Sequence, residues 1–302
     1  MPEQIFTMVG IGELLWDLLP TGKQLGGAPG NFAYMTSLLG DRGVPASRVG
    51  NDEFGQEALD KLSTLGLPTE YLQFDPAHAT GTVKVQIDGS GQPCYEIVQG
   101  VAWDFLEWTS QWRMLAEEAD AICFGSLAQR STRSRETIRA FLRASRPGTI
   151  KVFDVNLRQS FYNAEVLASA LAVAEIAKLN HEELRHVMRL LGLSYDGDVS
   201  SAERLRETQR LKLVCVTRGK HGSVLADESG THAHRGFEIQ VADTVGSGDA
   251  FTAGLVNRYL RGGSLADMND MANRAGAWVA SKVGAMPALG NDRIEEVLAE
   301  IG

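Results

Sequence analysis

Cysteine is scarce in this sequence of 302 residues. Cys94, Cys123 and Cys215 are scattered and odd in number, which argues against a disulfide framework and suits a reducing compartment. No positively charged leader precedes an apolar run, and no apolar stretch reaches the roughly 18 residues that a membrane helix needs. We therefore expect a cytoplasmic protein with no membrane partner.

Positive charge is also in short supply. Lysine and arginine number 29 against 38 aspartates and glutamates, so the net charge is −9. A general nucleic-acid binder needs a basic face, and we expect no nucleic-acid partner. Hydrophobic residues make up 44% and charged residues 22%, which is ordinary for a globular chain with a sizeable core. The length suits a single α/β domain over residues 1–302.

Two common nucleotide-binding motifs are missing. The apolar run Ile5–Ile11 predicts a buried first strand and ends in Gly10-Ile-Gly12, but position 15 is leucine and no helix follows directly. This is a poor match to a dinucleotide fingerprint. The sequence has no Gly-x4-Gly-Lys-Ser/Thr either, so a P-loop enzyme is excluded.

The hydrophobic pattern beyond residue 120 alternates between strands and helices. Apolar runs occupy 121–125, 150–155, 174–179 and 213–217, and helical patterns lie near 132–145, 163–173, 181–191 and 200–209. Such alternation predicts a parallel sheet with helices on both faces, with ligands beyond the carboxyl ends of its strands. Residues 82–87 and 94–98 instead alternate strictly, which predicts a β-hairpin with one half-exposed face.

The stretch Gly246-Ser-Gly-Asp249 points most directly to chemistry. A helical pattern follows over 250–260, so the backbone amides of 246–249 should lie at a helix N-terminus and form an anion site. Asp249 beside them could accept a proton. Such a turn often merely caps a helix, because an acidic side chain suits the helix dipole. An anion site beside a base is, however, what phosphoryl transfer to a hydroxyl requires.

A second stretch, 25–33, contains Gly-Gly-Ala-Pro-Gly-Asn. Together with Asp-Thr-Val-Gly-Ser-Gly-Asp-Ala-Phe at 243–251, it resembles the two signatures of the ribokinase-like, or phosphofructokinase-B, sugar kinases. Their order and separation match, and the resemblance extends over nearly the whole chain. It implies a ribokinase-like fold, ATP-dependent phosphorylation of a primary sugar hydroxyl, and a small β-sheet lid formed by about 12–24 and 78–103.

The resemblance also implies a set of sugar contacts. Asp17 stands where the family has an aspartate that binds two sugar hydroxyls, a task that suits a carboxylate. Gly27 would let the backbone approach the sugar, and Asn31 can both donate and accept hydrogen bonds. Asp249 would take the hydroxyl proton while amides of Gly246, Ser247 and Gly248 stabilise the transferred charge. A strand-edge carboxylate and a tight turn with a helix cap are the structural alternatives.

The stretch Asp154-Val-Asn-Leu-Arg158 closes a predicted strand and is most similar to fructokinases and 2-keto-3-deoxygluconate kinases. Arg158 would serve as a cationic clamp on the sugar or on the transferring phosphate, although a plain Asx-rich turn is the alternative. Fructose is the first expected substrate, because Glu96 on the lid would repel a sugar acid. Phosphorylation of 2-keto-3-deoxygluconate or ribose remains open.

A match to the family's Asn-x-x-Glu motif occurs at Asn180-His-Glu-Glu183. It implies Mg²⁺ held largely through waters near the nucleotide phosphates, which suits a hard cation. The same residues could simply cap a helix.

The resemblance also implies contacts with ATP and with a monovalent cation. Thr217–Gly222 resembles the nucleotide loop, in which Thr217, Gly219 and Gly222 would meet phosphate or ribose. The adenine pocket falls at Asn273 and Gly284. A K⁺ ion, which some members use, would lie near Asp243.

Two expectations concern assembly and class. The alternating strands at 82–98 leave an apolar face that needs cover, which predicts a homodimer through the lid. A non-catalytic regulatory protein that binds sugar and nucleotide is the alternative of another class. The pairing of Asp249 with both glycines argues against it, because a pure binder needs no base.

Overall fold

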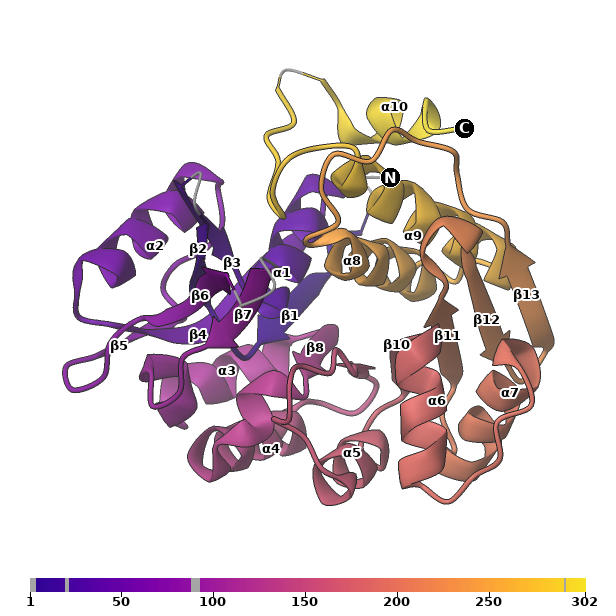
Figure 1. The fold of residues 1–302 in the computed structure, drawn as a ribbon, viewed down its shortest axis with the longest axis horizontal. Helices are drawn as coiled ribbons and strands as arrows, with labels where there is room; N and C mark the ends of the chain where they lie inside the picture. The colour runs from indigo at the N-terminus through magenta and orange to yellow at the C-terminus, as the bar shows by residue number, and fades with distance from the viewer. Residues whose placement is uncertain (1–3, 20–21, 88–92, 291) are drawn as a thin grey trace.

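The computed structural model describes residues 4–19, 22–87, 93–290 and 292–302 (Figure 1). Its described strands form a nine-stranded sheet in the order β13-β12-β11-β10-β9-β8-β1-β4-β5. The strands are β1 (Thr7–Ile11), β4 (Arg42–Gly50), β5 (Leu72–Asp75), β8 (Ala121–Gly125), β9 (Ile150–Asp154), β10 (Ile176–Asn180), β11 (Leu213–Thr217), β12 (Ser223–Asp227) and β13 (Gly230–His234). All neighbours from β11 to β5 are parallel, and β12 and β13 are antiparallel additions.

Helices cover both faces of this sheet, as predicted. One face carries α3 (Ser110–Glu118), α4 (Thr132–Ala144), α5 (Ala164–Leu171), α6 (His181–Leu190) and α7 (Asp198–Gln209). The other carries α1 (Ala28–Leu38), α8 (Ser247–Leu260), α9 (Leu265–Ala280) and α10 (Ile294–Ala299). A further helix, α2 (Glu53–Thr64), packs beside the small sheet described below.

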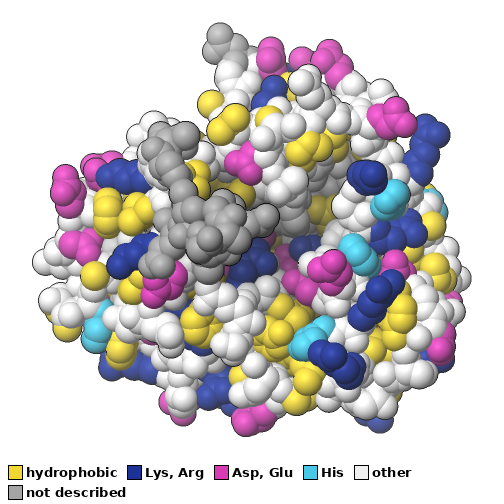
Figure 2. Space-filling model, viewed as in Figure 1, with side chains coloured by type: hydrophobic (Ala, Val, Ile, Leu, Met, Phe, Trp, Pro, Cys, Tyr) yellow, Lys and Arg dark blue, Asp and Glu magenta, His cyan; other side chains and the backbone are white. Residues whose placement is uncertain are grey.

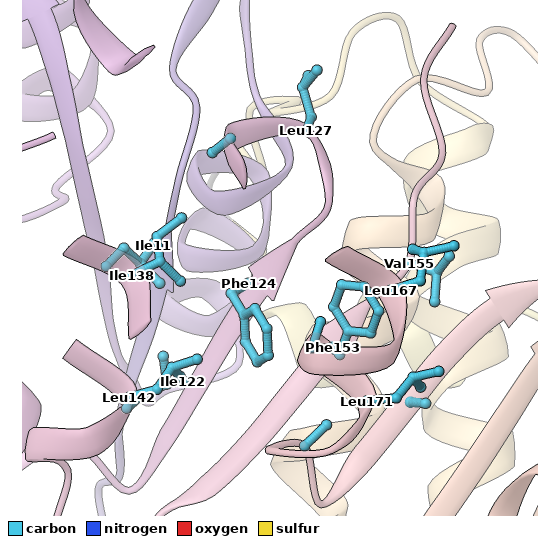
Figure 3. Packing of buried hydrophobic residues seen from close by; sticks show 14 of the residues in the cluster. Ile11, Ile122, Phe124, Leu127, Ile138, Leu142, Phe153, Val155, Leu167 and Leu171 are labelled. Carbon is cyan, nitrogen blue, oxygen red and sulfur yellow. The ribbon is translucent and has the colours of Figure 1, made fainter. Parts of the chain in front are cut away.

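The core on each face follows from the side-chain alternation of the strands. In β8, Ile122 and Phe124 point to one side and pack in a cluster with Ile138 and Leu142 of α4 (Figure 3). Cys123 points to the other side, into the cluster that faces α1, α8 and α9. Strands buried on both faces explain why their sequences read as continuous apolar runs.

Two helix starts lie earlier than the sequence pattern indicated. The first helix begins at Ala28 rather than near Asn31, since Pro29 suits the first helical turn. Gly10 has no dinucleotide role here: a Cβ at this position would lie 2.2 Å from the Pro29 carbonyl oxygen, so glycine allows α1 to pack closely on β1. The helix after the glycine motif begins at Ser247 rather than Ala250.

A small sheet stands apart from the large one, in the order β3-β2-β6-β7. Its strands are β2 (Leu15–Leu19), β3 (Gly22–Gly26), β6 (Gly81–Ile87) and β7 (Pro93–Ile97). The turn of the predicted hairpin, at 88–92, lies outside the described residues. Asp17 is paired in register with Val83 and therefore shares its face of the sheet.

Part of the small sheet's apolar face is covered within the chain. Val83 and Ile97 are both buried and belong to the same core cluster as Trp103. A second copy is therefore not needed to cover these two side chains. Lys84 and Glu96, paired on the opposite face, are exposed. Among the described residues, no helix has the length and apolar character to cross a membrane.

Candidate active site

The N-terminus of α8 lies near the carboxyl ends of the parallel strands. Gly246 caps the helix with a left-handed backbone (φ 78°), and a Cβ there would lie 2.5 Å from the Cβ of Ala285. Ser247 turns back on the preceding turn, where its hydroxyl donates to the Thr244 carbonyl at 2.8 Å. Within the described chain, the backbone amides of Gly248 and Asp249 donate to no other group. The helix thus presents two free donors, as an anion site requires. The amide of Ser247, which was predicted to be a third donor, is not free because it donates to the Thr244 carbonyl at 3.3 Å.

Asp249 is held by a residue from the other end of the sequence. Asn31 Nδ2 donates to Asp249 Oδ2 at 2.7 Å. Burial raises the pKa of Asp249 to about 6, Asp154 adds to the rise, and the Asn31 hydrogen bond with the charges of Lys178 and Arg158 opposes it. A carboxyl with this pKa is mostly ionised at pH 7 yet accepts a proton more readily than an exposed aspartate.

A buried ion pair lies beneath this helix terminus. Lys178 Nζ is 3.1 Å from Asp154 Oδ1 and 3.2 Å from Oδ2, and both side chains are buried. Thr252 Oγ1, one turn into α8, donates to Asp154 Oδ2 at 3.1 Å. Burial alone would lower the pKa of Lys178, but the negative charges of Asp154, Glu183 and Asp249 raise it above its ordinary value. Lys178 is therefore a permanent cation under the free amides.

The position of Lys178 explains Gly248. Gly246 has positive φ and Gly248 does not. A Cβ on Gly248 would instead lie 2.9 Å from Lys178 Nζ. Glycine at 248 thus leaves room for the ammonium group directly below the first turn of α8.

A further carboxyl is buried between β1 and β2. Glu13 is 2% exposed, and within the described residues its Oε2 atom has no hydrogen-bond partner. Burial raises the pKa of Glu13 to about 7; the Asp249 charge raises it further, while backbone amides and Arg158 oppose the rise. The Glu13 carbonyl also explains why residue 27 is glycine. A Cβ on Gly27 (φ 114°) would lie 2.5 Å from the Glu13 carbonyl oxygen.

Arg158 and Asp17 complete this group of side chains. Burial raises the pKa of Asp17, and the positive charge of Arg158 opposes that rise. Arg158 itself is exposed, with Nη1 3.2 Å from the Leu157 carbonyl oxygen. In the view of Figure 2 the surface is hollowed near its centre, and basic and acidic side chains lie side by side there.

A cavity of about 490 Å³ opens on the other side of the α8 terminus. Its lining includes four residues that were predicted to meet the nucleotide, Thr217, Gly219, Gly222 and Asn273. It also includes Ser247 and Gly248 of the predicted anion site. The volume suits a ligand of cofactor size. Gly248 thus borders the cavity, and Asp249 follows it on the side of Asn31.

Known proteins share this architecture. The model of the pfkB family carbohydrate kinases matches residues 20–291. The chain belongs to the pfkB carbohydrate kinase family. A fructokinase of Escherichia coli is 31% identical over 299 residues, spanning 92% of this chain and 94% of that protein. The family and these relatives identify it as a sugar kinase.

Solved structures of similar kinases superpose over almost the full length. A Vibrio cholerae fructokinase bound to fructose, ADP and calcium ion has a TM-score of 0.83 and 26% identity, covering 99% of this chain and all of that one. An uncharacterized sugar kinase from Pyrococcus horikoshii in complex with ATP has a TM-score of 0.79 and 27% identity, with the same coverage. The ribokinase-like fold that the two sequence motifs implied is therefore confirmed.

In this kinase, Asn180 and Glu183 form a capping box at the start of α6. Asn180 Oδ1 accepts from the amides of Glu182 and Glu183, and Glu183 Oε2 accepts from the amide of Asn180. No group of three or more His, Cys, Asp or Glu side chains in the described part of the kinase could hold a metal ion. Each of these oxygens already accepts from the backbone, and a carboxylate oxygen can accept a further hydrogen bond from a water bound to a cation.

In the kinase, Asp243 and Gly284 contact each other and do not line the cavity. Gly284 N donates to Asp243 Oδ2 at 3.1 Å, and Val245 N donates to Oδ1 at 3.0 Å. Gly284 does not line the 490 Å³ cavity. The adenine contact predicted for Gly284 therefore has no support from this geometry, whereas Asn273 does line the cavity.

Sequence reasoning missed Glu13 and Lys178, and treated Asp154 only as part of a turn. Lys178 lies inside an apolar run, where a single lysine looks like an exception on a strand. Glu13 follows Gly12 without a spacing that marks it. The signal that the sequence offered was a charged residue within or just after an apolar strand pattern, near the strand end where ligands bind.

Proposed function

We propose that this kinase transfers the γ-phosphoryl group of ATP to a primary hydroxyl of a small neutral sugar, with fructose as the preferred substrate. The observation that carries the proposal is the placement of Asp249. It bonds to Asn31 on one side and follows the free amide of Gly248, which borders the large cavity, on the other. A base and an anion site thus meet at one point, as phosphoryl transfer to a hydroxyl requires.

In the proposed mechanism Asp249 accepts the proton of the attacking hydroxyl. Asp17, Gly27 and Asn31 orient the sugar. The amides of Gly248 and Asp249 stabilise negative charge on the transferred group, and the turn of Gly246 and Ser247 aims them. Lys178 below adds positive potential to the helix terminus, and Arg158 clamps the sugar or the transferring phosphate from the other side.

The nucleotide is proposed to occupy the 490 Å³ cavity. Thr217, Gly219 and Gly222 would contact phosphate or ribose, and Asn273 the base. Bound Mg²⁺ would neutralise phosphate charge. Asn180 and Glu183 would contact it only through waters. Calcium and potassium ions accompany fructose and ADP in Vibrio cholerae fructokinase structures, so a K⁺ site near Asp243 stays part of the proposal.

Fructose is preferred because the relatives similar in sequence include several fructokinases. The expected repulsion of a sugar acid by Glu96 does not support this choice, because Glu96 and Lys84 lie on the face of the small sheet opposite Val83, whereas Asp17 shares the face of Val83. The alternatives within the class are 2-keto-3-deoxygluconate and ribose. We also propose that the small sheet acts as a lid within one domain and as the contact of a homodimer.

The direct test is ADP release coupled to a reporter reaction, with fructose, ribose and 2-keto-3-deoxygluconate under one set of conditions. We expect the highest kcat/KM for fructose. A tenfold preference for the acid, about 1.4 kcal/mol in transition-state binding, would contradict the fructose assignment and retain the kinase. Binding of sugar and nucleotide without ADP release would instead indicate the non-catalytic regulatory protein.

A further inference from the structure

The turn that carries Arg158 has an unusual backbone. Asn156 and Gln159, on either side of Leu157 and Arg158, both lie in the left-handed region, with φ of 40° and 48°. Asparagine tolerates this region better than most residues, but glutamine has no such advantage. Residues in this region persist where their surroundings hold them, and they are frequent at functional sites. Something must therefore hold this turn.

A carboxylate from α6, the helix that follows β10, holds this turn. Glu183 Oε1 accepts a hydrogen bond of 2.8 Å from the backbone amide of Leu157, 26 residues earlier in the chain. Its other oxygen, Oε2, accepts at 2.8 Å from the amide of Asn180. The side chain is buried, with 7% of its surface exposed. Hydrogen bonds from amides to an ionised carboxylate are stronger than those between neutral groups.

This arrangement exceeds what a helix cap needs. A capping box requires only that the glutamate accept from the N-cap amide, which Oε2 does. The bond from Oε1 instead joins the start of α6 to the turn after β9. A weaker contact from Ser126 Oγ to the Asn156 carbonyl, at 3.3 Å, supports the same turn from β8.

Arg158 is the one basic side chain in this turn, and its charge acts on the active site. Burial raises the pKa of Asp17, Glu13 and Asp249, and in each case the positive charge of Arg158 opposes the rise. These carboxyls come from β2, from the loop after β1 and from α8. Arg158 therefore lies close enough for its charge to act on carboxyls of all three elements.

We propose that Glu183 is a positioning residue for Arg158. Its carboxylate fixes the strained turn at 156–159, so that Arg158 faces Asp17 and Asp249 in the geometry that phosphoryl transfer needs. The proposal rests on the proposed function in one respect, the role of Arg158 as a clamp. It differs from a role of Glu183 toward Mg²⁺, which would not depend on Arg158.

The test is a double-mutant cycle in the full-length protein with Glu183→Gln and Arg158→Met. Arg158→Met alone should lower kcat/KM by about 10²–10³, as the loss of one donor to the transition state does. Glu183→Gln alone should lower it by roughly 10- to 100-fold, because a misplacement of about 1 Å has that effect. In the Arg158→Met background, the same Glu183→Gln change should cost less than about threefold, since coupled residues are not additive.

Glu182→Gln is the matched control, because Glu182 occupies the same helical turn, is exposed, and loses the same charge. It should change kcat/KM by less than about twofold, as surface changes usually do. The Mg²⁺ concentration for half-maximal rate reports separately on a water-mediated contact of Glu183 with the ion. Equal losses from Glu183→Gln in both backgrounds would overturn the positioning role, whatever the Mg²⁺ requirement.

A second measurement does not depend on activity. Amide hydrogen exchange of the segment containing Leu157 should be slow in the wild type and faster in Glu183→Gln, with no change in Glu182→Gln. Unchanged exchange in Glu183→Gln would overturn the proposal. ADP release by the wild type reports separately on the proposed function, so failure of one is distinguishable from failure of the other.

Discussion

Asn31 and Asp249 lie 218 residues apart in the chain, and their side chains are joined by a 2.7 Å hydrogen bond. The bond brings together the N-terminal turns of α1 and α8, which carry the two glycine motifs. Asn31 is 4% exposed, and its Oδ1 has no partner among the described residues. The pair therefore offers a proton acceptor and an unused hydrogen-bond acceptor side by side, as expected of a site for a sugar hydroxyl.

The pH dependence of the reaction should report the state of Asp249. Burial raises its pKa to about 6, and only the ionised carboxylate can accept a proton. We expect log kcat/KM to be level above this pH and to fall by about one unit per pH unit below it. A midpoint near 4, the value for an exposed aspartate, would contradict a buried base. Steady-state rates between pH 4.5 and 8.5 provide the measurement.

Gly248→Ala tests the space above Lys178. The added methyl group would lie 2.9 Å from Lys178 Nζ, so the ammonium group or the first turn of α8 must move. Alanine favours a helix over glycine by about 1 kcal/mol, so folding should tolerate the change, while kcat should fall by roughly 10- to 100-fold. Ser247→Ala is the control, because its hydroxyl faces Thr244. Equal rates in the two variants would argue against a role for this space.

Lys178→Met should separate stability from catalysis. The change leaves Asp154 buried without its cation, which typically costs about 3–5 kcal/mol of unfolding free energy. Adding Asp154→Asn removes the uncompensated charge, and we expect much of the thermal stability to return. The rate should stay low in the double variant, since the cation beneath α8 is still missing. Recovery of both properties together would reduce the ion pair to a structural role.

The homodimer through the small sheet is tested by sedimentation at micromolar concentration. Lys84 is exposed and lies on the face opposite Val83. Lys84→Glu places a new negative charge beside Glu96 in each copy, so it should weaken a dimer that buries this face. Monomers in the wild type would refute the assembly, and so would a dimer indifferent to this substitution.

The sequence predicted those parts of the site that a local sequence pattern marks. The glycine motif predicted a helix N-terminus with free amides, because Gly-Ser-Gly-Asp before a helical pattern is a local signal, although α8 begins three residues earlier than predicted, at Ser247. The alternation after residue 120 likewise predicted the parallel sheet. Lys178 and Glu13 were missed because their environment comes from residues far away in the chain, and a strand pattern does not show which single polar residue lies under a helix terminus.

Gly248 shows a similar limit. Glycine is needed there because a side chain would approach Lys178 of β10, and that lysine lies 70 residues earlier in the chain. Glu183 was predicted from the resemblance as a residue near Mg²⁺, but its bond to the Leu157 amide depends on a contact between two strand connections. Local patterns thus predict which elements form, and long-range packing decides what their polar side chains contact.

The measurement that tests the central claim most directly is kcat of Asp249→Asn with fructose and ATP, alongside fructose affinity. Asparagine keeps the size and the contact with Asn31 but cannot accept the proton. We predict that kcat falls by about 10²–10⁴, the range for loss of a general base, while fructose affinity changes little. The unfolding temperature should not fall, because burial disfavours the ionised carboxyl. A kcat near the wild-type value would show that Asp249 only caps α8.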